Sequence, residues 1–479
     1  MNTTRCNILK LAGVSLLALF VSAATDKTAP EPVSVIAGNV TGVVNPLFFG
    51  VNTLFMIDDD AALADGRIVE HLRAMPCRLM RFPGGDVADN YHWKAHTLDN
   101  PNWWPNESGP QTTDTDEFMA FCRKVGAEPI FVVDLESGFV RGDIASTARE
   151  AAEWVAYCKQ KGYRVRFWEI GNETYLYNPG QPPEHHKHKR IRITAAEYGR
   201  IFQQVTQAMK AVDPGALCGA VGPGSVTTSN NNRLPNGGKA NPPEPPWWPT
   251  VLKTVGAKPD FLVVHEYFGR KLTPELFARK GLDNGRELPE LKHFAQQALG
   301  RLVPLALTEW NLNKEFSIRG IVAAQIQAEM LCRYLNTGVD WATFWPLRLK
   351  GQSFRSVLDL KTNQPLSSWQ VLHFFAANAI GNIVQTEHTL PALFSFATLG
   401  DNPRTLSVFL INKATPGADR TITLNIKGFQ ATTARGQWLA AVTPESDELR
   451  QLPLEVSRQE NHWTCRLPAH ALALVKFRQ

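Results

Sequence analysis

The chain has 479 residues, a formal net charge of +5 and 10% aromatic residues, including 13 tryptophans. So small a charge on so long a chain, without any long basic face, argues against nucleic acid as a partner. The length is too great for one small core and fits a large domain with a smaller one beside it.

The first 24 residues have the pattern of an export signal. Arg5 and Lys10 precede the apolar stretch Leu11–Val21, and Val21-Ser22-Ala23 provides the small residues of a cleavage site. This apolar stretch is too short for a membrane span, which needs roughly 20 residues. We therefore expect a soluble protein without a membrane span, secreted or periplasmic after cleavage.

Six cysteines follow the expected signal, and their wide spacing matches no metal-binding motif. Export permits disulfides. Cys122 and Cys158 fall on adjacent predicted helices and are the candidates for pairing. We expect most of the six to be buried thiols.

Residues 46–380 alternate between apolar strands and helices. Helices are predicted from Thr147, with Glu150 completing a capping box, from Thr194, and up to Leu335. Eight apolar runs separate the helical stretches: 47–51, 78–82, 129–135, 165–170, 217–221, 261–265, 303–307 and 339–345. This pattern predicts an α/β fold, a (β/α)8 TIM barrel. A doubly wound open sheet is the alternative, but no glycine-rich phosphate loop follows the first run.

The period changes to strict alternation after residue 380, as at Leu406, Val408 and Leu410. Turn residues separate the alternating runs. We therefore expect a C-terminal antiparallel β-sandwich domain over 381–479. Residues 25–45, with a strand at 33–36, are expected to join that sandwich.

Two glutamates follow buried strands, Glu173 after the fourth and Glu309 after the seventh. Sites in such barrels form at the carboxyl ends of the strands. Two carboxylates at that end suit hydrolysis of a glycosidic bond, with one as acid and one as nucleophile about 5 Å apart in a retaining enzyme. Either glutamate alone would equally well be a solvated loop residue.

Other strand ends supply candidate substrate-binding residues. Arg81 can hold a carboxylate ionised, or can form a purely structural ion pair. The remaining candidates are Asn52, Asn172, His265, Tyr267 and Trp345. Tyr267 is suited to orient the nucleophile and Trp345 to carry a sugar ring, although Trp345 and His265 would also fit an ordinary core.

The phrases Arg81-Phe82-Pro83-Gly84-Gly85, 168–173, His265-Glu266-Tyr267 and 308–311 occur in an order that resembles clan A glycoside hydrolases. The greatest similarity is to the α-L-arabinofuranosidases of glycoside hydrolase family 51. The resemblance implies Glu173 as acid/base, Glu309 as nucleophile, Asn172 on the sugar 2-hydroxyl, and Arg81 and Tyr267 supporting Glu309. It implies a carbohydrate partner, such as a plant polysaccharide or oligosaccharide, with neither cofactor nor metal.

Two departures from that family concern the sugar. The stretch 49–55 lacks the glutamate that grips arabinofuranose there, and Thr308 stands where an acid is common. A basic run at 185–190, with Arg141, would suit a carboxylated sugar, so a β-glucuronidase of the same clan is an alternative. A β-xylosidase or endoglucanase is a further one.

Two alternatives from other classes remain. A non-catalytic carbohydrate-binding protein would keep the groove without the chemistry. A metal-dependent hydrolase would need several His or Asp ligands at strand ends, where only His265 is found.

Overall fold

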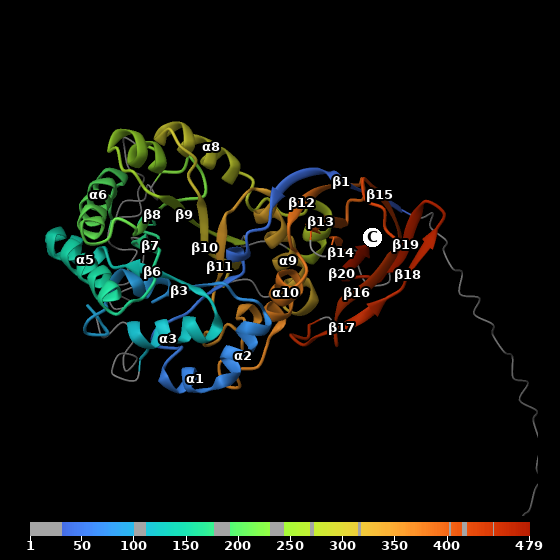
Figure 1. The fold of residues 1–479 in the computed structure, drawn as a ribbon, viewed down its shortest axis with the longest axis horizontal. Helices are drawn as coiled ribbons and strands as arrows, with labels where there is room; N and C mark the ends of the chain where they lie inside the picture. The colour runs from blue at the N-terminus through green and yellow to red at the C-terminus, as the bar shows by residue number, and fades with distance from the viewer. Residues whose placement is uncertain are drawn as a thin grey trace, which may run out of the picture.

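The computed structural model consists of a closed barrel and a β-sheet domain beside it (Figure 1). It describes residues 31–99, 112–176, 192–229, 244–268, 273–314, 318–401, 404–413, 419–443 and 445–479. The expected signal segment 1–24 and the basic run 185–190 lie outside these residues. Among the described helices, none combines the length and apolar character that crossing a membrane requires.

Eight parallel strands close the barrel in sequence order, which confirms the predicted (β/α)8 fold. They are β2 (Gly50–Asn52), β3 (Leu79–Phe82), β6 (Glu128–Val133), β7 (Phe167–Ile170), β8 (Leu217–Val221), β9 (Phe261–Phe268), β10 (Leu305–Leu312) and β11 (Trp341–Phe344). Nearly every residue in them is buried, as expected for strands packed on both faces.

Strands β9 and β10 run further than the apolar pattern predicted. Glu309, expected after the seventh strand, therefore lies within β10, and β9 continues past His265 to Phe268. The first predicted strand, 47–51, begins too early, because Leu47 belongs to a short 3-10 helix, η1 (Pro46–Phe48), capped by Asn45. The apolar run there marks a buried turn before the first strand.

The helices surround the barrel, with α9 and α10 on the side that faces the sheet domain (Figure 1). They are α1 (Asp60–Ala64), α2 (Gly66–Ala74), α3 (Thr115–Val125), α4 (Glu136–Arg141), α5 (Ile144–Gln160), α6 (Ala195–Val212), α7 (Pro274–Lys280), α8 (Leu288–Leu299), α9 (Gly320–Asn336) and α10 (Ser367–Ala376). The helix start predicted at Thr194 is confirmed, since Thr194 caps α6 and forms a capping box with Glu197. The start predicted at Thr147 is wrong, because Asp143 accepts a hydrogen bond from the Ser146 amide and begins α5 earlier.

The second domain is a ten-stranded sheet folded around its own core. Its strands are β1 (Glu31–Val43), β12 (Asn382–Glu387), β13 (Leu393–Asp401), β14 (Arg404–Asn412), β15 (Arg420–Lys427), β16 (Thr433–Ala441), β17 (Leu449–Leu454), β18 (Val456–Gln459), β19 (His462–Leu467) and β20 (Leu472–Arg478). Trp463 and Phe477, on strands distant in the sheet order, have ring centres 5.6 Å apart. The two halves of the sheet therefore face each other as a sandwich.

The N-terminal strand β1 joins the sandwich. It pairs antiparallel with β12 and parallel with β15. A buried ion pair connects the two domains, because Lys413 after β14 lies 3.1 Å from Glu329 on α9.

The six described cysteines are buried free thiols. The pairing considered for Cys122 and Cys158 is therefore absent. Burial raises the pKa of Cys158 to about 12, which keeps this thiol protonated.

Candidate active site

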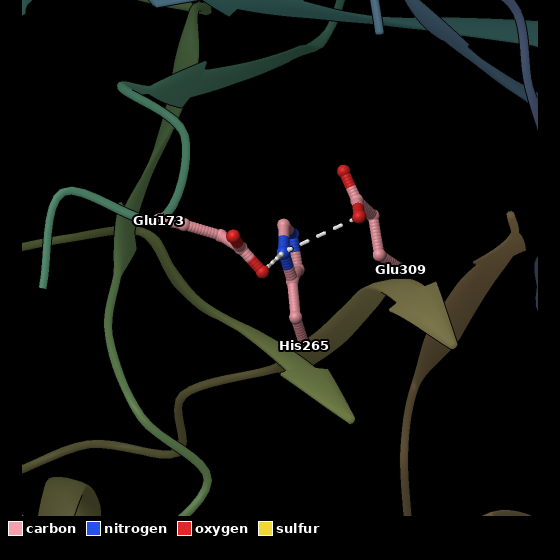
Figure 2. Close-up of side chains that lie close together, drawn as sticks. All are labelled: Glu173, His265 and Glu309. Carbon is pink, nitrogen blue, oxygen red and sulfur yellow. Dashed lines mark hydrogen bonds and ion pairs between the residues drawn. The ribbon is translucent and has the colours of Figure 1, made fainter. Parts of the chain in front are cut away.

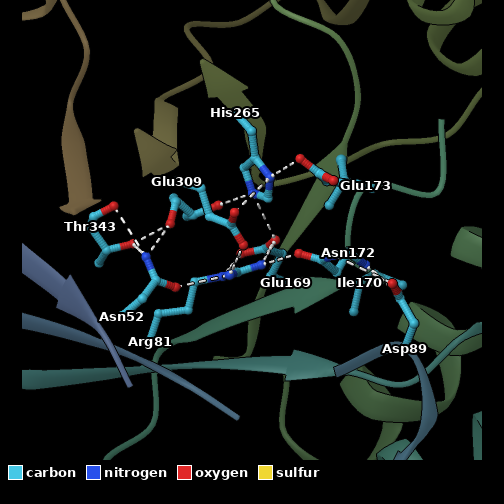
Figure 3. A network of polar contacts seen from close by, with 12 residues as sticks. Asn52, Arg81, Asp89, Glu169, Ile170, Asn172, Glu173, His265, Glu309 and Thr343 are labelled. Atoms are coloured by element: carbon cyan, nitrogen blue, oxygen red, sulfur yellow. Dashed lines mark hydrogen bonds and ion pairs between the residues drawn. The ribbon is translucent and has the colours of Figure 1, made fainter. Parts of the chain in front are cut away.

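Arg81 is the centre of a polar network inside the barrel at the carboxyl ends of the strands (Figure 3). Its side chain has no exposed surface. Its Nε and Nη2 donate to Glu169 at 2.9 and 2.7 Å, and Nη1 donates to Glu309 at 2.8 Å. The amide oxygens of Asn52 and Asn172 accept the remaining bonds, at 2.9 and 2.8 Å. All five N–H groups of the guanidinium thus have acceptors.

Glu169 was not among the residues predicted for the site. It lies on β7 in an otherwise apolar strand and is fully buried. Burial alone would raise its pKa, but the charge and hydrogen bonds of Arg81, together with His265, lower it below its ordinary value. Glu169 is therefore ionised at neutral pH. A charged residue in the middle of a buried strand was the signal that could have identified it.

A β-bulge at Thr308 turns Glu309 toward Arg81. In the pairing of β10 with β9, Leu307 lies opposite Val264 and Glu309 opposite His265, so Thr308 is the additional residue. Such bulges change the direction of a side chain and are common near active sites. Thr308 and Glu309 consequently both contact residues of the network.

Both carboxylate oxygens of Glu309 accept hydrogen bonds. Arg81 donates to one, and the Tyr267 hydroxyl donates to the other at 2.5 Å. Burial raises the pKa of Glu309 and the nearby Glu173 adds to this, whereas His265, Arg81 and Tyr267 act in the opposite direction. The net effect raises the pKa of Glu309 above its ordinary value. His265, Arg81 and Tyr267 limit this rise and favour the ionised form, which is the form that a nucleophile requires.

Glu173 lies three residues after β7 and faces Glu309 across His265 (Figure 2). Its backbone has a φ of 46°, a left-handed conformation uncommon outside glycine. The His265 Nδ1 lies 3.0 Å from the Glu173 Oε1. Oxygens of Glu173 and Glu309 lie within 4.8 Å of each other. The separation is in the range associated with retaining glycosidases rather than inverting ones.

Three carboxylates surround His265 and keep it charged. Burial opposes the charge, but Glu309, Glu169 and Glu173 outweigh it and raise the pKa of His265 to about 9. The charged ring donates from Nδ1 to Glu173 and from Nε2 to the Thr308 hydroxyl at 3.0 Å. Thr308 therefore fixes the ring although it is not acidic.

Asn172 and Asn52 hold Arg81 from two sides. The Asn172 backbone amide donates to Asp89 at 2.7 Å, which fixes the turn leading to Glu173. Asn52 donates from its amide to the Thr308 carbonyl at 2.7 Å and has no exposed surface. The structure thus places Asn52 as a support for Arg81, since its side chain is buried and hydrogen-bonded.

Tyr267 and Trp345 reach the mouth of the site. Both are partly exposed, and the guanidinium of Arg355 lies 5.6 Å from the centre of the Tyr267 ring. A cleft of about 870 Å³ opens beside β9, lined by residues 265–268, by Gly224 and Ser225, and by residues 280–284, 286 and 287. Its lining includes His265 and Tyr267 but neither Glu173 nor Glu309, so the cleft adjoins the two carboxylates rather than enclosing them.

Glu173, His265 and Glu309 are also the described residues with the spacing of a metal site (Figure 2). A cation bound there would have to displace the protons of His265 and compete with Arg81 and Tyr267 for Glu309. The hydrogen bonds that Glu173, His265 and Glu309 make suit proton transfer better than metal binding.

The nearest acid after β2 does not replace the missing sugar-binding glutamate. Asp58 is buried and accepts a hydrogen bond from Arg348 at 2.9 Å. This pair connects the loops after β2 and β11. Arg141, proposed to face an acidic sugar, donates to Asp99 at 2.8 Å, so its charge is already balanced.

Alkaline pH should destabilise the protein through His265. Its pKa is raised from 6.5 to about 9, so the stability it contributes is complete below pH 6.5 and lost as pH rises through about 9. His92, beside Asp99 and Glu150, has a pKa of about 10 and acts in the same direction. We expect the melting temperature to fall from pH 6.5 to 10.

The two histidines can be separated by substitution. His265→Gln should remove the part of the fall that ends near pH 9, and His92→Gln the part that ends near pH 10. A melting temperature of His265→Gln that depends on pH as in the unsubstituted protein would contradict this assignment.

The fold and the paired glutamates define the class, a (β/α)8 barrel with a β-sandwich and a carboxylate site at its mouth. Comparison with known proteins is more specific. Residues 71–224 match the family described as alpha-L-arabinofuranosidase 1 domain. An intracellular exo-alpha-(1->5)-L-arabinofuranosidase of Acetivibrio thermocellus is 27% identical over 238 residues, which cover 45% of this chain and 40% of that protein.

Solved structures share the fold over nearly the whole chain. An alpha-L-arabinofuranosidase from Thermotoga maritima aligns with a TM-score of 0.72 and 18% identity, covering 94% of this chain and 100% of that one. A bifunctional glucanase-xylanase from a metagenome library aligns with a TM-score of 0.66 and 17% identity over 94% and 100% of the two chains. The resemblance to α-L-arabinofuranosidases is confirmed, and the same fold also carries other glycosidase specificities.

Proposed function

We propose that this chain is a retaining glycoside hydrolase with Glu309 as nucleophile and Glu173 as acid/base. The observation that carries the proposal is the separation of the two carboxylates, within 4.8 Å across His265. The similarity of residues 71–224 to an arabinofuranosidase domain supports it.

In the first step, Glu309 attacks the anomeric carbon while Glu173 gives its proton to the leaving glycosidic oxygen. Arg81 and Tyr267 orient Glu309 through its two oxygens. His265 donates to the Oε1 of Glu173 and so orients the carboxyl group that carries the acid proton.

In the second step, Glu173 takes a proton from water, and this water breaks the glycosyl–Glu309 ester. The bond that forms is between the water oxygen and the anomeric carbon. Glu309 leaves as a carboxylate and Glu173 is protonated again, so the enzyme returns to its starting state.

The proposed substrate carries a terminal α-L-arabinofuranosyl residue, as on a plant polysaccharide or oligosaccharide. The name of the Acetivibrio relative, an exo-alpha-(1->5)-L-arabinofuranosidase, describes action on such residues. Because Asp58 is engaged with Arg348, the arabinofuranose hydroxyls would meet another partner here. For this reason a β-glucuronidase and a β-xylosidase or endoglucanase stay as alternatives.

Four aryl glycosides test the substrate: α-L-arabinofuranoside, β-D-glucuronide, β-D-xyloside and β-D-glucoside. We expect release of the aryl group from the arabinofuranoside, with at least about tenfold higher kcat/KM than from the other three. Cleavage of the glucuronide alone would contradict the proposed arabinofuranosyl specificity. It would leave the proposed roles of the two glutamates unchanged.

The same panel separates the other classes of function. Activity that survives a chelator excludes a metal-dependent hydrolase. If arabino-oligosaccharide binds by calorimetry and none of the four aryl glycosides is cleaved, the chain is a carbohydrate-binding protein and the proposal is wrong.

We also propose that the protein is exported and loses its first 24 residues. The charged start, apolar stretch and small-residue site support this. N-terminal sequencing of protein expressed with its natural start should begin near residue 24 or 25. Protein that stays inside the cell with Met1 uncleaved would contradict this proposal.

A further inference from the structure

Arg81 divides its hydrogen bonds unequally between two glutamates. Glu169, which the proposed reaction does not use, takes a bidentate pair at 2.9 and 2.7 Å. Glu309 receives one bond, at 2.8 Å. Figure 3 shows the guanidinium lying between them. Bidentate pairing is the stronger arrangement, so the charge of Arg81 is directed mainly at the residue that takes no part in bond making.

Glu169 also faces His265. The Glu169 Oε1 lies 3.8 Å from the His265 Nε2, on the side of the ring away from Glu173. Glu169 therefore contacts both cations of the site. It lies within the barrel with no exposed side-chain surface, where water cannot screen these charges.

Among the groups that contact Arg81 and His265 directly, the charges balance only when Glu169 is counted. Arg81 and His265 carry two positive charges, and Glu169 and Glu309 carry two negative charges. With Glu173 protonated, as the first step requires, the sum is zero. Without Glu169, the same protonation state would leave one uncompensated positive charge in a buried space.

We propose that Glu169 is the counter-ion that keeps Glu309 reactive and His265 charged. If Arg81 had no second partner, its full charge would act on Glu309 and make that carboxylate a weaker nucleophile. Glu169 takes up most of that charge, so that Arg81 orients Glu309 without stabilising it excessively. Glu169 is thus a positioning residue that acts through Arg81 and His265. The inference rests on the proposed glycosidase function.

Other titratable groups surround these residues and stay in place in the test. Those that face Glu169 besides Arg81 are His265 and the phenols of Tyr175 and Tyr198. Those that face Glu309 besides Arg81 are His265, Glu173, Tyr175, Tyr267 and Arg355.

The test is the pH profile of kcat/KM for Glu169→Gln, measured with whichever aryl glycoside the unsubstituted enzyme cleaves. The substitution keeps the size and removes the charge. Arg81 should then favour ionised Glu309 more strongly, so the acidic limb should move to lower pH. The alkaline limb is set by the proton of Glu173. His265, no longer shared with Glu169, should favour ionised Glu173 more strongly, so this limb should move down as well. Each shift should be about one pH unit or more, and kcat should fall.

Asp58→Asn is the matched control, because Asp58 is a buried acid paired with an arginine, Arg348, and contacts neither catalytic glutamate. It should lower the melting temperature and leave both limbs in place. Limbs that stay in place in Glu169→Gln, or that move equally in Asp58→Asn, would overturn the proposal.

If Glu169→Gln does not fold, Glu169→Asp provides the test. Aspartate keeps the charge, but its side chain is one methylene shorter, so the charge lies further from Arg81. Both limbs should therefore move in the same direction as in Glu169→Gln, by a smaller amount. Unmoved limbs in the folded Asp variant would also overturn the proposal. If the unsubstituted protein cleaves no glycoside, the glycosidase function is wrong instead, so the two failures are distinguishable.

Discussion

Glu309→Gln should lower kcat by at least roughly 10⁴-fold on any substrate that the enzyme cleaves. The amide is too weak a nucleophile to form the glycosyl ester. Its oxygen can still accept the bond from Arg81, and its shape fills the same space, so the fold should be kept. Steady-state kinetics with circular dichroism of the same sample measures both. Residual activity above one per cent would show that Glu309 is not the nucleophile.

Glu173→Ala provides the complementary control. With a good aryl leaving group, the first step should stay fast without the acid. The second step should be slow, because no base activates the water. Added azide should then restore turnover and yield a glycosyl azide of retained configuration. Azide should have no such effect on Glu309→Gln.

Arg81→Met should cost the largest amount of stability among single substitutions in the site. It removes the arginine that both buried carboxylates, Glu169 and Glu309, pair with, and leaves them only the more distant charge of His265. Loss of one partner of a buried pair typically costs about 3–5 kcal/mol. We expect a large decrease in the urea midpoint of unfolding, or a largely insoluble protein.

Two control variants separate the buried charge from side-chain packing. Arg81→Met with Glu169→Leu removes a cation together with its bidentate partner and should recover much of the lost stability. Arg166→Met, which breaks a bidentate but exposed pair with Glu128, should change the midpoint little. If the double variant is no more stable than Arg81→Met, the buried-charge explanation is wrong.

The barrel could be predicted from the sequence because each strand is a short apolar run followed by polar residues. Glu173 and Glu309 became candidates for the same reason, as acids within three residues of the ends of such runs. The limits of β9 and β10 could not be predicted, because Tyr267 and Glu309 are polar yet continue the strand pairing. Their side chains point into a network that satisfies them, and periodicity does not reveal this.

Glu169 and the Thr308 bulge depend on tertiary contacts. Glu169 is stable inside β7 only because Arg81 reaches it from β3, two strands away with β6 between. The bulge is visible only in the register of β10 against its neighbours. The start of α5 was missed for a local reason, since Asp143 is as good a cap as Thr147 and comes first.

The most direct measurement of the central assignment is covalent trapping. A slow mechanism-based inactivator, such as a fluorinated or cyclophellitol-type analogue of the sugar that is cleaved, should form a stable ester with the nucleophile. Peptide mass spectrometry of the inactivated protein should find one added glycosyl mass on Glu309, and Glu309→Gln should remain unlabelled. A label on Glu173, or inactivation without any covalent adduct, would contradict the account.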